Sequence, residues 1–204
     1  DMLELGSFEQ IYAEHNFIWC CKSYKTLFEK YSLYLNKVEH YSIHGGSMRY
    51  FFSRENIQEQ SAKKYLELEE KIQVSNDTTY QKFRDKSINL CNNLKNFLIE
   101  KKNEGKSVCG YGATAKSTTL LNFAEINTSL IDCIYDSTPA KIGKLTPGTH
   151  IPINDASTFH LKNFDYTIIF AWNLKDEIIN KEKHNGAKTI WVEYVPEIKL
   201  TNAN

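Results

Sequence analysis

The pattern of apolar and polar positions predicts one helix and two strands in the first part of the chain. Residues 23–34 place Tyr24, Leu27, Phe28 and Tyr31 on one helical face, and Ser23 is in position to cap the start. Residues 33–40 and 47–53 alternate as strands do. The glycine-bearing connection between them predicts an antiparallel hairpin.

A long helical stretch, residues 58–102, follows the hairpin, and its polar break near residues 75–77 predicts two helices. Apolar side chains in the second half recur every three to four positions: Tyr80, Phe83, Leu90, Leu94, Phe97 and Leu98. Gly105, after two lysines, is a typical helix end. We expect this face to pack into a core or an interface, and we place a domain boundary at residues 74/75.

Strands and helices alternate after residue 105 in the order β-α-β-loop-β-β-α-β. The strands are expected near 108–109, 131–136, 151–153, 166–171 and 189–195, the last being the final strand, with a helix over 174–183. The continuous apolar run 166–171 is typical of a buried parallel strand. The fold class is therefore α/β. A Rossmann-like, doubly wound, mostly parallel sheet is predicted in 75–204, preceded by a helix, a β-hairpin and a helical connector in 1–74.

A glycine motif, GYGATA, joins the first of these strands to a helix. It has the G-x-G-x-x-A spacing of a dinucleotide fingerprint. Gly110 is expected to permit a tight turn, Gly112 to let the backbone approach a phosphate, and Ala115 to let the helix pack close to the strand. Asp136, 21 residues after Ala115, ends the second strand, where an acid often binds a ribose. A glycine turn without a ligand remains an alternative.

A turn-rich loop, residues 137–150, follows Asp136 and carries Lys141 and Lys144. Open α/β sheets bind ligands at the carboxyl ends of their strands, so these lysines are candidates for a phosphate. Solvated loop lysines are the alternative.

An acid–base group is suggested near the start of the chain, where Tyr12, Glu14 and His15 lie within four residues. A carboxylate can orient an imidazole and a phenol can hydrogen-bond beside it, which is the composition of a proton relay. Packing of an aromatic segment is the alternative. His44, beside two glycines, either lines a cleft or is a turn histidine in solvent.

Composition narrows the function classes. The 25 basic and 25 acidic residues balance, which argues against nucleic acid or an anionic membrane as the main partner. No apolar run approaches the ~20 residues of a membrane span. The five cysteines show no C-x-x-C spacing, so a reduced, cytoplasmic protein without a structural metal is expected. The abrupt, apolar start at residues 1–5 suggests the C-terminal part of a longer protein.

Several stretches in this order resemble the sugar C-methyltransferases that use S-adenosylmethionine on nucleotide-linked 4-keto sugars. They are FEQIYAEHNF, HGGSMR, GYGATAKSTTLLN, KLTPGTHIPI and AWNLKDEI, at residues 8–17, 44–49, 110–122, 144–153 and 171–178. The likeness runs from about residue 5 to 198. It covers the end of a methyltransferase domain and a complete Rossmann-like C-terminal domain, so the family's zinc ligands and cofactor-binding glycines have no counterpart in the chain.

The resemblance implies roles for individual residues. His15 would be the base that removes the proton alpha to the ketone, with Glu14 tuning it, Tyr12 binding the oxyanion and His44 lining the cleft. The nucleotide diphosphate and sugar would lie near a second set: Gly110, Gly112, Ala113, Lys116, Asp136, Thr149, His150 and Asn173. S-adenosylmethionine would be bound by a domain not present in this chain. The chain alone would then be inactive as a methyltransferase.

Three functions therefore stay open. The first is the C-terminal part of a C-methyltransferase acting on a thymidine-diphosphate 4-keto deoxysugar. The second is a module that binds a nucleotide sugar without turnover. The third is an NAD-dependent enzyme that uses the glycine motif conventionally, although residues 105–204 offer no convincing acid–base pair. The oligomeric state does not follow from the sequence.

Overall fold

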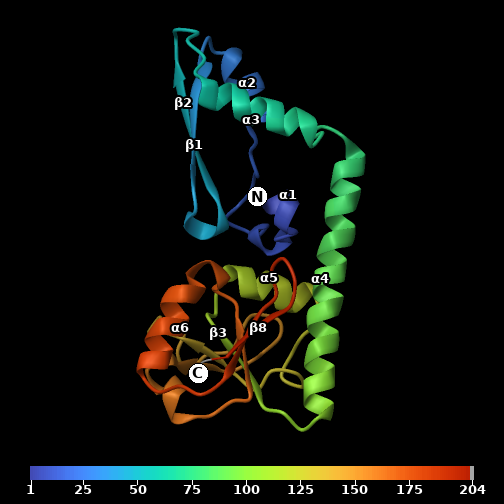
Figure 1. Cartoon of the computed structure of the whole chain (residues 1–204), viewed down its shortest axis with the longest axis vertical. Coiled ribbons are helices and arrows are strands. Elements are labelled where there is room, and N and C mark those ends of the chain that lie inside the picture. Colours follow the sequence, from blue (N-terminus) through green and yellow to red (C-terminus); the bar gives the residue numbers. More distant parts are fainter. Residues whose placement is uncertain (203–204) are drawn as a thin grey trace. The chain divides into compact units, whose positions relative to one another are not determined.

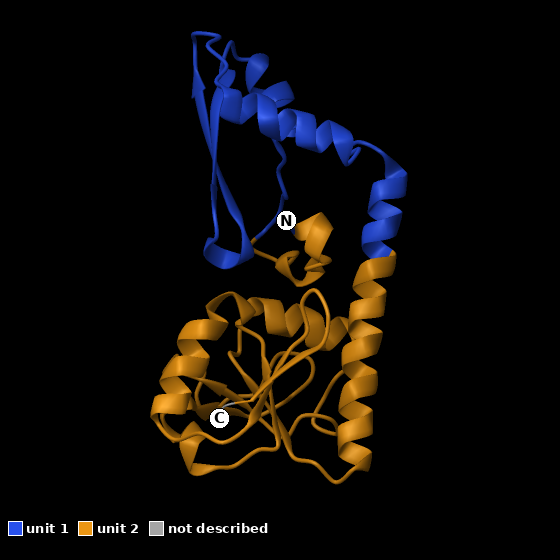
Figure 2. Ribbon diagram, in the orientation of Figure 1, with its two compact units in different colours: residues 1, 15–84 blue, residues 2–14, 85–204 orange. Residues whose placement is uncertain are grey.

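The computed structural model describes residues 1–202, which form two compact units. The first comprises residue 1 and residues 15–84, and the second comprises residues 2–14 and the chain from 85 onward (Figure 2). By packing, residues 2–14 thus group with the C-terminal part of the chain. The predicted division at 74/75 stays a prediction.

The first unit is built on an antiparallel hairpin, as predicted. Strands β1 (Tyr34–Tyr41) and β2 (Ser47–Ser53) pair with a bulge near Leu35, and the short 3₁₀ turn η2 (Ile43–Gly45) joins them (Figure 1). Helices α2 (Cys21–Glu29) and α3 (Gln60–Lys71) pack on β1 around Cys21, Leu35, Val38 and Ala62.

The start of α2 differs from the prediction. Cys20, not Ser23, is the N-cap, and the Ser23 hydroxyl accepts a hydrogen bond from the Cys20 backbone N–H (3.0 Å). The Glu69 carboxylate of α3 accepts hydrogen bonds from the N–H groups of Cys21 (2.6 Å) and Lys22 (2.8 Å). A carboxylate at a helix N-terminus satisfies amides that the helix leaves unpaired, so a tertiary contact fixes this end.

Helix α4 (Asp77–Asn103) begins in the first unit and continues in the second, and the break between α3 and α4 falls where the sequence predicts it. Leu90, Leu94 and Leu98 of α4 are buried, as the apolar stripe requires. The helix ends before Gly105, which has a φ of 74°.

The second unit is a Rossmann-like sheet of six strands in the order β5-β4-β3-β6-β7-β8. Five strands are parallel: β3 (Val108–Tyr111), β4 (Ile134–Asp136), β5 (Ile153–Asp155), β6 (Tyr166–Ile169) and β7 (Ile190–Glu193). The other main-chain elements are α1 (Met2–Leu5), η1 (Phe8–Gln10), α5 (Ala115–Phe123), η3 (Ala156–Leu161), η4 (Trp172–Leu174) and α6 (Lys175–His184). The predicted α/β class and doubly wound sheet are confirmed.

The edge of the sheet departs from the prediction. Strand β7 is not the last, because β8 (Lys199–Asn202) pairs antiparallel with it. Only one of its four residues is as much as half-buried, so a short polar edge strand leaves no apolar pattern in the sequence. Strand β4 is also shorter than predicted, starting at residue 134.

Aromatic side chains fill one core of this unit. Tyr111, Tyr135, Phe159 and Trp191 are buried and meet edge-on or tilted, with ring centroids 5.1–5.9 Å apart. Edge-on and tilted contacts between buried rings stabilise a fold beyond the free energy gained by burying the apolar area of the rings. Within residues 1–202, no helix combines the length and hydropathy that a bilayer span requires.

Candidate functional site

The strand order reverses between β3 and β6, because β4 and β5 lie on one side of β3 while β6 and β7 lie on the other. In open α/β sheets ligands bind at such a switch point, outside the carboxyl ends of the two strands. Here β3 leads into residues 112–114 and α5, and β6 leads into residues 170–173. These two connections define the candidate site.

Lys116 and Asn173 meet at the switch point. The Lys116 ammonium donates a hydrogen bond to Asn173 Oδ1 (3.0 Å) and lies 4.9 Å from the centroid of the Trp172 indole ring. Burial lowers the pKa of Lys116, and the nearby Glu9 opposes this effect. The structure thus brings together two of the predicted substrate-binding residues, from α5 and from η4.

Glu9 completes this group, and sequence reasoning missed it. Its side chain is fully buried, and Oε1 accepts a hydrogen bond from the Trp172 indole N–H (2.9 Å). Burial raises the pKa of Glu9, while the indole, its own backbone N–H and Lys116 act in the opposite direction. The element η1 that carries it packs on α5, with the rings of Phe8 and Phe123 4.9 Å apart.

The backbone N–H groups at the glycine turn are hydrogen-bonded within the chain. The N–H of Ala113 donates to Asp136 Oδ2 (2.7 Å), and the N–H of Thr138 donates to Asp136 Oδ1 (2.8 Å). The Thr114 hydroxyl caps α5 by accepting from the Ser117 N–H (3.0 Å). Lys141 closes the turn by donating to the Ala113 carbonyl (2.7 Å), with its ammonium 3.5 Å from Asp136.

Close packing, rather than a ligand, accounts for both glycines. Gly110 lies inside β3, not in a turn as expected, and a Cβ there would overlap the Phe170 ring. Gly112 has a φ of 93°, and a Cβ on it would lie 3.0 Å from Ala171 Cβ. Asp136 is 6% exposed and bonded within the chain. These residues do not fit a dinucleotide or a nucleoside methyl donor held in the conventional way.

Replacing Asp136 with asparagine should destabilise the second unit by about 1–3 kcal/mol, because the amide group would leave either the buried N–H of Ala113 or the N–H of Thr138 without an acceptor. Asp155→Asn is the matched control, since Asp155 Oδ1 accepts only from the Ser157 N–H (2.9 Å) at an exposed position. Urea denaturation followed by tryptophan fluorescence compares the two variants. Equal losses of unfolding free energy in the two variants would contradict a special role for the buried Asp136 carboxylate.

Two other predicted substrate residues lie elsewhere. Thr149 bonds the Thr146 hydroxyl (2.7 Å), and His150 has a left-handed φ of 55°, both in a turn that packs near the end of α5. The Asn122 side chain of α5 holds this turn by donating a hydrogen bond to the Pro147 carbonyl (3.0 Å). Asn122 is six residues after Lys116, roughly 9 Å along the helix axis. Thr149 and His150 thus lie near the last turn of α5, whereas Lys116 lies in its first turn, and their substrate-binding role stays a prediction.

The predicted acid–base residues are distributed over both units. Tyr12, half-buried, and Glu14, exposed, belong to the second unit, whereas the exposed His15 begins the first. His44 lies in η2 with a φ of 56°, followed by Gly45 and Gly46 with φ of 86° and 112°. A left-handed φ is uncommon at a residue with a side chain and often marks functional turns. Their catalytic roles stay predictions.

A family model for the C-methyltransferase C-terminal domain matches residues 42–196. The chain belongs to this family. It is also 29% identical, over its whole length, to C-methyltransferase NovU of Streptomyces niveus. It spans 49% of that protein, so it corresponds to about half the length of the curated relative.

The family match covers Lys116, Asp136, Trp172 and Asn173, together with strands β3 to β7. The segment with Glu9, Tyr12, Glu14 and His15 precedes the matched range, although the alignment with NovU includes it. The resemblance to the C-methyltransferases is thereby confirmed at the level of the family. The conventional dinucleotide prediction gains no support from the comparisons.

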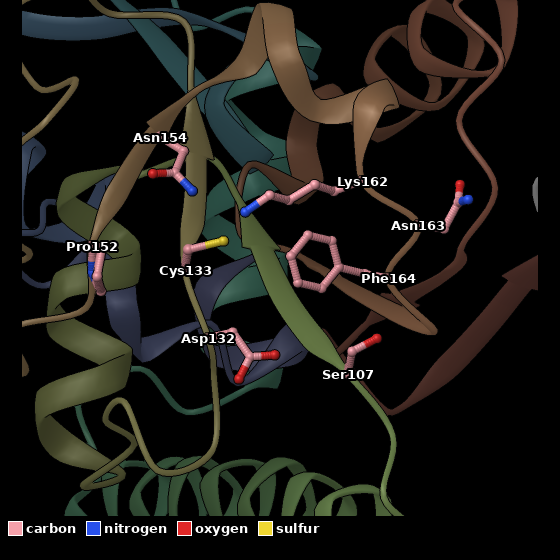
Figure 3. A pocket seen from close by; sticks show the side chains of 8 residues that line it. All are labelled: Ser107, Asp132, Cys133, Pro152, Asn154, Lys162, Asn163 and Phe164. Carbon is pink, nitrogen blue, oxygen red and sulfur yellow. The ribbon is translucent and has the colours of Figure 1, made fainter.

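A depression of about 540 Å³ lies at the opposite edge of the sheet from the switch point. Figure 3 shows it lined by residues that precede the parallel strands, among them Ser107, Asp132 and Phe164. The amino ends of parallel strands are not where such sheets bind ligands. Among the described residues, no group of three or more His, Cys, Asp or Glu side chains could hold a metal ion.

Proposed function

We propose that this chain is the C-terminal, substrate-binding part of an S-adenosylmethionine-dependent C-methyltransferase acting on a thymidine-diphosphate 4-keto deoxysugar. The observation that carries the proposal is the meeting of Lys116 and Asn173 at the switch point of a sheet that belongs to the C-methyltransferase C-terminal family. A desolvated ammonium suits a diphosphate, and an amide beside it can accept hydrogen bonds from sugar hydroxyls.

The chemistry of this proposal begins with a C–H bond. The imidazole of His15 takes the proton from the carbon alpha to the ketone, and the electron pair of that bond forms an enolate whose charge lies on the carbonyl oxygen. The proposed role of Tyr12 is to donate a hydrogen bond to this oxyanion, and that of Glu14 is to tune the base. The carbanion carbon then accepts a methyl group.

The methyl donor would be S-adenosylmethionine, bound by a domain outside these 204 residues. The residues of the glycine turn do not fit it, because their amides are bonded within the chain. A cytoplasmic location is part of the proposal, since nucleotide sugars are made there and all five cysteines are free thiols.

Binding tests the proposal most directly. Calorimetric titration of the chain with a thymidine-diphosphate 4-keto sugar, NAD and S-adenosylmethionine should give heat with the sugar nucleotide alone. Lys116→Ala should weaken that binding about 10- to 100-fold, because a charge-assisted hydrogen bond contributes about 1.5–3 kcal/mol.

Lys188→Ala is the matched control, since it removes the same charge from an exposed position just before β7 at the opposite edge of the sheet. It should leave the affinity unchanged. Tight binding of NAD without any signal from the sugar nucleotide would overturn the proposal.

A further inference from the structure

The mechanism above leaves one buried acid unused. Glu9 is fully buried beside the switch point, and only one of its two oxygens has a hydrogen-bond partner among the described residues. Oε1 accepts from Trp172, while Oε2 is buried without a partner. A desolvated carboxylate is costly unless it is paired, and it commonly responds by taking up a proton.

Three ionisable groups interact electrostatically with Glu9. Lys116 comes from α5, Tyr194 from the residues after β7, and Cys91 from α4. Burial raises the pKa of Tyr194 and raises that of Cys91 to about 12, with the charge of Glu9 adding to both shifts. Both groups are therefore neutral near pH 7, and Lys116 is the one opposite charge that Glu9 experiences from this set.

Glu9 and Lys116 both contact the side chain of Trp172. The indole N–H of Trp172 bonds the Glu9 carboxylate, and the Lys116 ammonium lies over the ring of the same indole. Lys116 lowers the pKa of Glu9, and burial raises it. Neutralising the ammonium removes the lowering effect, so the pKa of Glu9 then rises further.

We propose that Glu9 is a positioning residue that takes up a proton from solvent when an anionic group of the ligand binds at Lys116. The proton forms a bond with Oε2, and Oε1 continues to accept from the indole. Glu9 lies three residues before Tyr12. Protonation of Glu9 therefore couples the segment that leads to Tyr12 and Glu14 to ligand binding at the switch point. The inference rests on the proposed function for the identity of the anion.

The Trp172 indole N–H reports this event directly. In the ¹⁵N-labelled chain its resonance, assigned with Trp172→Phe, should titrate with the ionisation of Glu9. Glu9→Gln keeps an oxygen acceptor of the same shape and should abolish the titration. Lys116→Gln should raise the midpoint, because it removes the positive charge that lowers the pKa of Glu9.

Saturating thymidine diphosphate, with inorganic pyrophosphate as a second probe, should raise the midpoint in the unaltered chain in the same direction as Lys116→Gln. The effect should be missing in Glu9→Gln, although that variant should still bind the probe. These results together would support the proposal, because a merely structural glutamate would not respond to the charge at Lys116.

Four results would overturn it. The Trp172 resonance could show no titration, or its midpoint could be the same in Lys116→Gln. Alternatively, thymidine diphosphate could shift other resonances while the midpoint stays constant, which would reject the coupling and leave the proposed function intact. If Lys116→Gln raises the midpoint but neither probe changes any resonance, the ligand dependence fails together with the proposed function.

Discussion

Replacing His15 with asparagine should slow the exchange of the sugar's alpha proton by about 10²- to 10⁴-fold, the usual contribution of a positioned general base. The chain incubated with a thymidine-diphosphate 4-keto deoxysugar in D₂O should introduce one deuterium alpha to the ketone, because enolate formation needs no methyl donor. Mass spectrometry of the sugar nucleotide follows the exchange, with the rate in buffer alone subtracted.

His184→Asn is the matched control, since His184 is exposed in the last turn of α6 and has no proposed role. It should exchange at the unaltered rate. An unaltered rate in His15→Asn would reject His15 as the base. Binding of the sugar nucleotide without exchange in any variant would favour the alternative in which the chain only binds a nucleotide sugar.

Gly110→Val should destabilise the second unit by about 3 kcal/mol or more. Gly110 is buried in β3, and a side chain there meets the Phe170 ring and lies 3.0 Å from Ile134 Cγ1. Phe170 is itself fully buried and packs against Tyr194, with ring centroids 6.2 Å apart, so it has little freedom to move. Overfilling a packed core typically costs about 1–3 kcal/mol for smaller insertions. Urea denaturation followed by fluorescence measures the loss.

A second substitution separates this packing effect from any loss of backbone freedom. Phe170→Leu makes room beside residue 110 at its own cost, and combining it with Gly110→Val should be less destabilising than the sum of the two changes. Strict additivity would show that the ring is not what excludes a side chain at this position.

The order of helices and strands is largely predictable because burial imposes a period on the sequence. The apolar run of β6 is of this kind and is buried as expected. In the stripe of α4, Leu90, Leu94 and Leu98 are buried, whereas Tyr80 near its start is 48% exposed. Strand β8 gave no such signal, since an edge strand with exposed side chains needs no apolar face. The cap of α2 was misplaced because Glu69, 48 residues from Cys21, supplies the acceptors.

The site was harder to predict than the fold. Lys116 and Asn173 are predicted only through the family resemblance, and both lie just beyond the carboxyl ends of β3 and β6, where such sheets bind ligands. Thr149 and His150 were assigned by motif, but the path of a 14-residue loop depends on contacts such as that of Asn122. Glu9 left no signal at all, because a charged residue in an aromatic segment is expected to face water. Its indole partner lies 163 residues away.

Two side chains of the chain itself, the Asp136 carboxylate and the Lys141 ammonium, bind the backbone of the glycine turn. They occupy the amide and the carbonyl of Ala113, two groups that a bound nucleotide would otherwise compete for. The glycine pattern alone would therefore assign a coenzyme to a turn whose Ala113 amide and carbonyl are already bonded within the chain. An acid at the end of the second strand with a lysine five residues later is the additional feature to examine before a glycine-rich turn is assigned a coenzyme.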